Sequence, residues 1–82
     1  MDVFLTEEAR KQYKKLSKAE KDKVDKKIIL VFKEPFIGKK LTGEYKNFKS
    51  LKAWPYRIIY WIDEPKKIIW VISILHRQGA YK

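Results

Sequence analysis

The sequence predicts an α+β fold, in which an amino-terminal strand and a two-helix hairpin pack on a twisted antiparallel sheet of about four strands. Apolar residues recur at helical spacing through residues 9–32, which indicates two amphipathic helices. Beyond Gly38, runs of β-branched and aromatic residues alternate with turn residues, which indicates strands. A chain of 82 residues is too short to divide its core, so residues 1–82 are expected to form a single domain.

The chain begins with a short extended segment at residues 2–5, and the first helix is expected to follow it. Thr6 offers a hydroxyl that caps a helix, and the acids at positions 7 and 8 suit the positive end of the helix dipole. Apolar side chains then recur at helical spacing at Ala9, Tyr13 and Leu16.

A second helix is expected from Ser17, because Ser17 and Glu20 have the spacing of a capping box. Pro35 disfavours helical geometry in the residue before it, so this helix should end near Glu34. Its predicted buried stripe consists of Val24, Ile28, Val31 and Phe32.

Three consecutive strands are predicted at residues 48–53, 56–62 and 67–75. Trp54-Pro55 and residues 63–66 supply the turns, where the missing donor of proline does no harm. We expect an antiparallel meander, joined by the amino-terminal strand and covered on one face by the helices. Trp61 and Trp70 lie within apolar strands and are expected in the core rather than stacked on bases.

The net charge of +10 is unevenly distributed. Residues 1–34 hold ten basic and seven acidic residues, whereas residues 35–82 hold ten basic and three acidic. An excess of +7 in the second half predicts a polyanionic partner, with nucleic acid first and an acidic protein next. The residues expected to bind RNA are Lys39, Lys40, Lys46 and Lys49.

Composition excludes several other classes. The chain has no cysteine and one histidine, so it offers no disulfide framework, thiolate nucleophile or zinc cluster, and no cofactor is expected. No apolar run approaches the roughly 20 residues that span a bilayer, and the amino terminus resembles no secretory signal. We therefore expect a cytoplasmic protein with no membrane partner.

Arginine placement indicates where the chemistry lies. Only three of the twenty basic residues are arginine, and two of them, Arg57 and Arg77, fall in the predicted sheet. Arginine grips phosphate with a planar fork of donors, so we expect a phosphate-handling surface there, with a surface ion pair as the alternative for each arginine. His76 is a candidate proton carrier, but strand alternation would point His76 and Arg77 to opposite faces, which leaves a capping or packing role open.

The order of elements and four short motifs resemble the RelE/ParE toxin superfamily over nearly the whole chain. The motifs are Leu-Thr-Gly at 41–43, Tyr-Arg-Ile-Ile-Tyr at 56–60, His-Arg at 76–77 and Tyr-Lys at 81–82. The resemblance implies a helical hairpin packed on a twisted antiparallel sheet. It also implies one of two activities, because RelE-like toxins cleave messenger RNA on the ribosome and ParE-like toxins poison DNA gyrase.

In the RelE-like branch, the resemblance implies that Arg57 and Arg77 bind and stabilise the scissile phosphate, and that Tyr81 assists at the cleavage site. Tyr81 has the alternative of closing over the core. Lys52 falls at a position that is frequently basic in the family. Ser50 stands where many relatives place Lys or Arg, and Phe48 where some place Lys, so no residue is assigned as the general base.

The favoured interpretation is a metal-independent endoribonuclease that cleaves messenger RNA in the ribosome, inhibits translation and is neutralised by a cognate acidic antitoxin. Its catalytic candidates are Arg57, Arg77, Tyr81, His76 and Lys52. Two alternatives stay open. One is a ParE-like inhibitor of DNA gyrase, and the other is an inactive member that binds only an antitoxin or nucleic acid.

Overall fold

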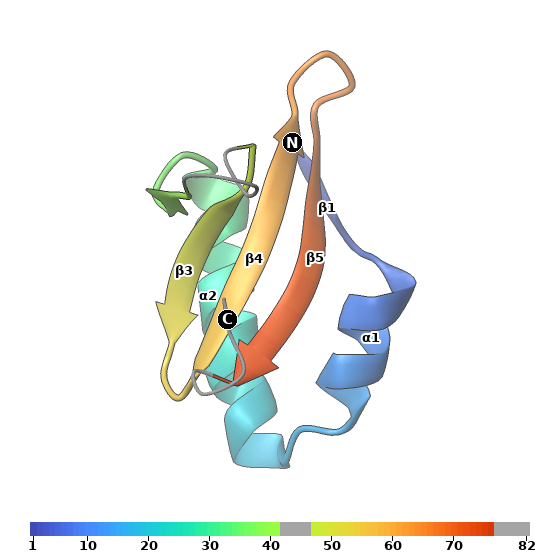
Figure 1. Cartoon of the computed structure of the whole chain (residues 1–82), viewed down its shortest axis with the longest axis vertical. Coiled ribbons are helices and arrows are strands. Elements are labelled where there is room, and N and C mark those ends of the chain that lie inside the picture. The colour runs from blue at the N-terminus through green and yellow to red at the C-terminus, as the bar shows by residue number, and fades with distance from the viewer. Residues whose placement is uncertain (42–46, 77–82) are drawn as a thin grey trace.

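The computed structural model of the chain describes residues 1–41 and 47–76. Within these residues, two helices and a five-stranded sheet follow one another (Figure 1). The elements are β1 (Asp2–Leu5), α1 (Glu7–Lys14), α2 (Lys18–Lys33), β2 (Lys39–Lys40), β3 (Lys49–Ala53), β4 (Tyr56–Asp63) and β5 (Ile68–His76). Neither helix of this described part is long and apolar enough to cross a membrane.

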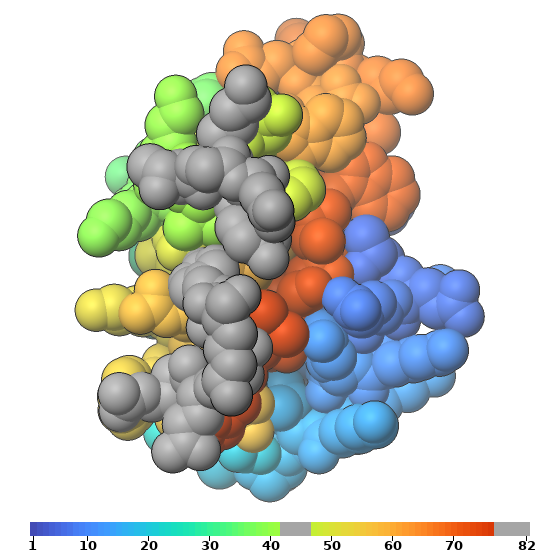
Figure 2. All heavy atoms as spheres, viewed as in Figure 1, coloured from blue at the N-terminus to red at the C-terminus, as the bar shows by residue number. Residues whose placement is uncertain are grey.

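The two helices take different positions on the sheet, whose strands lie in the order β1-β5-β4-β3-β2. α2 runs across one face behind β3 and β4, whereas α1 lies to the side of β5 (Figure 1). In the space-filling view the blue atoms of α1 lie directly against the red atoms of β5 (Figure 2). The predicted α+β class, helix pair and three-stranded meander are confirmed.

Both predicted helix starts are confirmed by their caps. The Thr6 hydroxyl accepts a hydrogen bond from the Ala9 amide at 3.2 Å. The Ser17 hydroxyl accepts from the Glu20 amide at 3.2 Å, and Glu20 Oε1 accepts from the Ser17 amide at 2.8 Å, which completes the capping box. These contacts satisfy amide groups that the first turn of a helix otherwise leaves without partners.

The sheet differs from the prediction in the direction of one strand and in the number of strands. β1 pairs with β5 in parallel, with Asp2 opposite Ile68 and Leu5 opposite Val71, so the sheet is mixed. Both helices and the other strands separate β1 from β5 in sequence, and so long a connection permits parallel pairing. β2 contains only two lysines, which is too short for a strand pattern to reveal.

α1 covers the edge of β5 beyond the point where β1 ends. Thr6 Oγ1 donates to the Ile72 carbonyl at 2.9 Å, and Gln12 Oε1 accepts from the Ile74 amide at 2.6 Å. The Ser73 hydroxyl also donates to Glu8 Oε2 at 2.6 Å. Side chains of α1 thus supply partners to polar groups that a bare strand edge would expose.

The core lies between α2 and the sheet. Val24 and Val31 of α2 are fully buried, and they belong to clusters that include Ile58 and Tyr60 of β4. Val3 of β1 packs against both clusters. Alternate residues of β4 therefore face α2, and the residues between them face the opposite side of the sheet.

The prediction that Phe32 and Trp61 are buried in the core is wrong. Phe32 is 54% exposed, because it lies where α2 extends beside β1, which is the edge strand of the sheet in the described residues. Trp61 is 36% exposed, because it follows the core residue Tyr60 and points to the face away from α2. Trp70 is partly buried, with its ring centroid 5.5 Å from that of Phe4.

Candidate functional site

Lys52 and Arg57 lie directly opposite each other on the paired strands β3 and β4. The turn at Trp54 and Pro55 folds the chain back, and these two cations form the second pair of the ladder counted from the turn. Ile58 faces the core beside α2, and Arg57 therefore points to the other face together with Lys52. Lys52 is exposed and Arg57 is half-buried.

Ser50 of β3 and Lys39 of β2 form a second cross-strand pair on the same face of the sheet as Lys52 and Arg57. Ser50 is two residues from Lys52 along β3, so both side chains share a face, and Ser50 pairs with Lys39 of β2. Ser50 is only 4% exposed, whereas Lys39 is exposed. Three cations therefore surround a small buried hydroxyl.

A cavity of about 270 Å³ opens at this edge of the sheet, and we call it the basic cavity. Lys27 reaches it from α2, although it is far from the other lining residues in sequence. The described lining residues include four cations and no acid, so the cavity attracts anions. They are Lys27, Ile37, Lys39, Ser50, Leu51, Lys52 and Arg57.

Lys40 and Lys49 occupy different positions from Lys39 and Lys52. They pair with each other across β2 and β3, in the pair next to that of Lys39 and Ser50. Because neighbouring residues of a strand point to opposite faces, Lys40 and Lys49 lie on the face opposite to Lys39. Lys49 is half-buried, and its Nζ lies 5.8 Å from the ring centroid of Phe36, which is a cation–π contact. The four lysines predicted to bind RNA are thus divided between two faces where the structure describes them.

His76 is separated from Arg57 by the sheet itself. It pairs with Tyr56, and the two rings meet edge to face with centroids 5.4 Å apart. Tyr56 packs against the core and its hydroxyl donates to Glu20 Oε2 of α2 at 2.8 Å, so this contact lies on the face covered by α2. The β5 residue opposite Arg57 is Leu75.

Glu20 links this end of the sheet to the helix. Its carboxylate accepts hydrogen bonds from the Ser17 amide and the Tyr56 hydroxyl, and these contacts hold the pKa of Glu20 below its ordinary value. The same bond raises the pKa of Tyr56, because the phenol is held as a donor. One carboxylate therefore ties the start of α2 to the start of β4.

Tyr60 and Gly38 form a contact that the sequence analysis missed. The buried Tyr60 hydroxyl donates to the Pro35 carbonyl at 2.8 Å and accepts from the Gly38 amide at 2.8 Å. An added Cβ at Gly38 would lie 2.7 Å from Tyr60 Cε1, so only glycine fits there. Burial raises the pKa of Tyr60. The available signal was a tyrosine in an apolar strand, which needs a polar partner when buried.

Three predicted site residues, Arg77, Tyr81 and Lys46, lie outside the described residues. Of the remaining candidates, the structure brings Arg57, Lys52 and Lys39 to one cavity. Across residues 1–41 and 47–76, no group of three or more His, Cys, Asp and Glu side chains is arranged to hold a metal ion.

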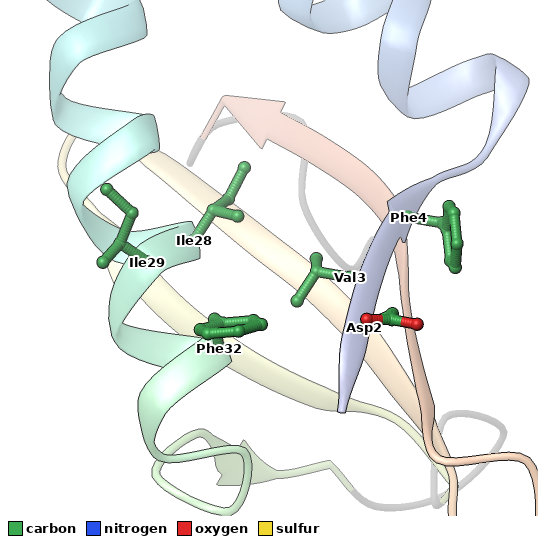
Figure 3. Close-up of a pocket in the computed structure, with 6 residues that line it drawn as sticks. All are labelled: Asp2, Val3, Phe4, Ile28, Ile29 and Phe32. Atoms are coloured by element: carbon green, nitrogen blue, oxygen red, sulfur yellow. The ribbon is translucent and has the colours of Figure 1, made fainter.

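A second hollow, which we call the apolar groove, lies between β1 and α2. It has a volume of about 430 Å³, and Val3 and Phe32 point into the space between the two elements (Figure 3). Phe32 and Ile29 are both more than half exposed. The lining residues are Asp2, Val3, Phe4, Ile28, Ile29 and Phe32.

Comparisons with known proteins agree with the fold. A family model described as "ParE toxin of type II toxin-antitoxin system, parDE" matches residues 3–81. The mRNA interferase toxin RelE of Escherichia coli (strain K12) is 31% identical over 76 residues, which cover 90% of this chain and 80% of that protein.

Two solved structures are similar over most of their length. A chain in the RelBE2 toxin–antitoxin complex of Mycobacterium tuberculosis has a TM-score of 0.84 and 27% identity, covering 93% of this chain and 96% of its own. The isolated RelE toxin of Escherichia coli has a TM-score of 0.80 and 26% identity, covering 92% of this chain and 82% of its own.

Proposed function

Because the chain belongs to the RelE/ParE superfamily of toxins from toxin–antitoxin systems, we propose that it is a RelE-type endonuclease, which cleaves messenger RNA on the ribosome and inhibits translation. The observation that carries this proposal is the position of Lys52 opposite Arg57, at a cavity whose described lining has four cations and no acid. The 31% identity to a protein named as an mRNA interferase supports the same activity.

In this reaction the ribose 2′-hydroxyl gives its proton to a base while its oxygen bonds to the neighbouring phosphorus, and the bond from that phosphorus to the 5′-oxygen of the next nucleotide breaks. Negative charge develops on the phosphoryl oxygens as this happens. Arg57 donates to those oxygens through its planar fork, and Lys52 adds a second cation within one strand spacing. Arg77 is proposed to complete the charge stabilisation, and Tyr81 to stack on a base or protonate the leaving oxygen. No cofactor enters the proposal.

His76 has a packing role in this proposal. Its ring meets Tyr56 on the face that α2 covers, whereas Arg57 and Lys52 point to the other face. A proton carrier must come within hydrogen-bond reach of the reacting oxygen, directly or through one water. The placement therefore supports the alternative in which His76 holds the end of β5.

The proposed partner is a cognate antitoxin with acidic and apolar residues, acting in the cytoplasm. The similar chain from Mycobacterium tuberculosis is part of a toxin–antitoxin complex, which supports a protein partner of this kind. Acidic residues of the antitoxin would meet Lys39, Lys40, Lys46 and Lys52, while apolar residues would fill the apolar groove beside Phe32.

The test is to map messenger RNA cleavage on ribosomes programmed with a defined message. Wild-type protein should cut the message, and Arg57→Ala should not, while both show the same thermal unfolding transition. Arg10→Ala, which removes the same charge from the exposed face of α1, is the matched control and should retain cleavage. Absence of cleavage by the folded wild type would contradict the proposal.

Inhibition of DNA gyrase is the second candidate, because the matching family model is named for ParE. A supercoiling assay with purified gyrase separates the two activities. Gyrase inhibition without cleavage of ribosome-bound message would identify this branch, and Arg57→Ala would then show whether the basic cavity takes part.

A further inference from the structure

We infer that the basic cavity binds the phosphate next to the scissile one along an RNA strand, with Lys27 and Lys39 as its ligands. This inference rests on the proposed function, since it extends the same site by one nucleotide. It assigns a binding role to Lys27, a residue of α2 that neither the motifs nor the charge clusters of the sheet indicate.

Ser50 provides the first argument. Its side chain is small and buried, and it stands opposite Lys39 in the row next to the pair of Lys52 and Arg57. A lysine or arginine at position 50, as the family resemblance leads one to expect, would occupy the space where the cavity opens. Lys27 and Lys39 instead bring positive charge to this space from neighbouring elements.

The charge balance provides the second argument. Lys27, Lys39 and Lys52 repel one another at this cavity, whose described lining contains no acid. Two acids of α2 are held elsewhere, since Asp25 accepts from the Tyr13 hydroxyl at 2.7 Å and Glu20 binds Ser17 and Tyr56. An anion with several acceptor oxygens is the ligand that relieves this repulsion.

The distance along β3 between Ser50 and Lys52 provides the third argument. Ser50 and Lys52 are two residues apart on β3, which corresponds to about 6.6–6.8 Å along the strand. Successive phosphates of an extended single strand are separated by a comparable distance. An RNA strand that places one phosphate at Lys52 and Arg57 and runs along β3 therefore places its neighbour beside Lys39.

The backbone at Lys39 is held in place before a ligand binds. Gly38 is held by the Tyr60 hydroxyl, and Lys39 follows it and pairs with Ser50 of β3. A side chain on a fixed backbone loses less conformational freedom on binding than one on a mobile loop, and so contributes more to affinity. The hydrogen bond between the Gly38 amide and the Tyr60 hydroxyl thus helps to position this subsite.

The experiment measures binding of two uncleavable probes to the isolated full-length protein at low salt. One is a 2′-O-methyl dinucleotide with a single phosphate, and the other is a 2′-O-methyl trinucleotide with two. Lys27→Ala should weaken binding of the trinucleotide about tenfold, as expected for one lost charge-assisted contact, and leave the dinucleotide unchanged. Arg57→Ala should weaken binding of both probes.

Salt dependence supplies an independent measure. The slope of log affinity against log salt for the trinucleotide should fall by about 0.7 in Lys27→Ala, which is the value for one lost single-strand phosphate contact. Lys26→Ala is the matched control, because Lys26 is exposed on the same helix and does not line the basic cavity. Thermal unfolding of each variant verifies that the fold is retained.

Several results would overturn the subsite. Equal effects of Lys27→Ala and Lys26→Ala on the trinucleotide, equal losses for the two probes, or failure of the wild type to bind the trinucleotide more tightly than the dinucleotide would each do so. Messenger RNA cleavage measured in parallel separates the two proposals. Cleavage without dependence on Lys27 rejects only the subsite, whereas trinucleotide binding that depends on Lys27 without cleavage rejects only the proposed function.

Discussion

Lys52 and Arg57 face each other across β3 and β4, so two like charges occupy one cross-strand pair. Like charges directly opposite each other destabilise a sheet. An arrangement that opposes folding is expected where a ligand rather than stability determines the residues. A phosphate bound between the two side chains would convert their repulsion into attraction.

Arg57→Ala should reduce the rate of message cleavage about 100- to 1,000-fold, because it removes a donor that stabilises charge in the transition state. Arg77→Ala is expected to have a similar effect. Single-turnover cleavage on programmed ribosomes measures the rate, and circular dichroism verifies the fold. A folded Arg57→Ala protein with the wild-type rate would remove Arg57 from the site.

Lys52→Thr should raise the free energy of unfolding by about 0.2–1 kcal/mol while it lowers cleavage. The substitution removes one of two opposed charges and introduces a residue that favours strands. Urea denaturation measures the change, and Lys66→Thr in the turn after β4 is the control that should leave the free energy nearly constant. A loss of stability in Lys52→Thr would show that the two cations do not repel each other in the free protein.

The elements that sequence analysis predicted correctly depend on local interactions. Thr6 and Ser17 cap their helices through residues three positions away, and Pro35 acts on its neighbour, so short patterns suffice to place them. Phe32 has the spacing of a core residue, but its burial depends on whether a strand lies across from it. The burial of Phe32 is therefore determined by the order of strands in the sheet, which the sequence of α2 does not reveal.

The candidate site shows the same distinction. The pair of Lys52 and Arg57 follows from the turn that joins β3 to β4, and the motif at residues 56–60 indicates one of its members. Lys27 shares their cavity because α2 packs against β3, and nothing in its sequence neighbourhood separates it from the other lysines of that helix.

Tyr60→Phe should lower the free energy of unfolding by about 1–3 kcal/mol, because it leaves the buried Gly38 amide and the Pro35 carbonyl without their partner. Hydrogen exchange at Gly38 should also become faster. Tyr13→Phe is the matched control, since it removes a single bond to Asp25 at a more exposed position and should cost less. Equal losses in the free energy of unfolding for Tyr60→Phe and Tyr13→Phe would contradict a special role for the hydrogen bonds of Tyr60.

Glu20 should make stability depend on pH. Its pKa in the folded protein is below its ordinary value, first because of the Ser17 amide and then because of the Tyr56 hydroxyl. Its contribution is therefore complete above the ordinary glutamate pKa of about 4.3 and is lost as the pH falls through the folded value. Glu20→Gln should be less stable than wild type at pH 7, and this difference should shrink toward pH 3.

Thermal unfolding from pH 7 to pH 3 measures that difference. Glu7→Gln is the control, because Glu7 forms an exposed ion pair with Lys11 at 3.4 Å, and such pairs contribute only about 0–1 kcal/mol. A difference between Glu20→Gln and wild type that stays constant with pH would mean that the carboxylate charge is not what joins α2 to β4.

Binding of the antitoxin should divide into a charge-dependent association and a dissociation governed by the apolar groove. Stopped-flow association should slow steeply as salt rises, because the lysines of the sheet half steer an acidic partner, while dissociation should change less. Replacing Lys39 and Lys40 by alanine should slow association and flatten its salt dependence. Phe32→Ser should instead speed dissociation about tenfold, as expected for losing the burial of a half-exposed aromatic ring.

Phe36→Ser is the matched control for the groove, because Phe36 is 59% exposed and does not line it. If Phe32→Ser and Phe36→Ser change dissociation equally, the apolar groove is not the anchor. If association is indifferent to ionic strength, the positive charge does not recruit the antitoxin and serves RNA alone. Because the replacement of Lys39 and Lys40 acts on association and Phe32→Ser acts on dissociation, either half of this prediction can fail while the other stands.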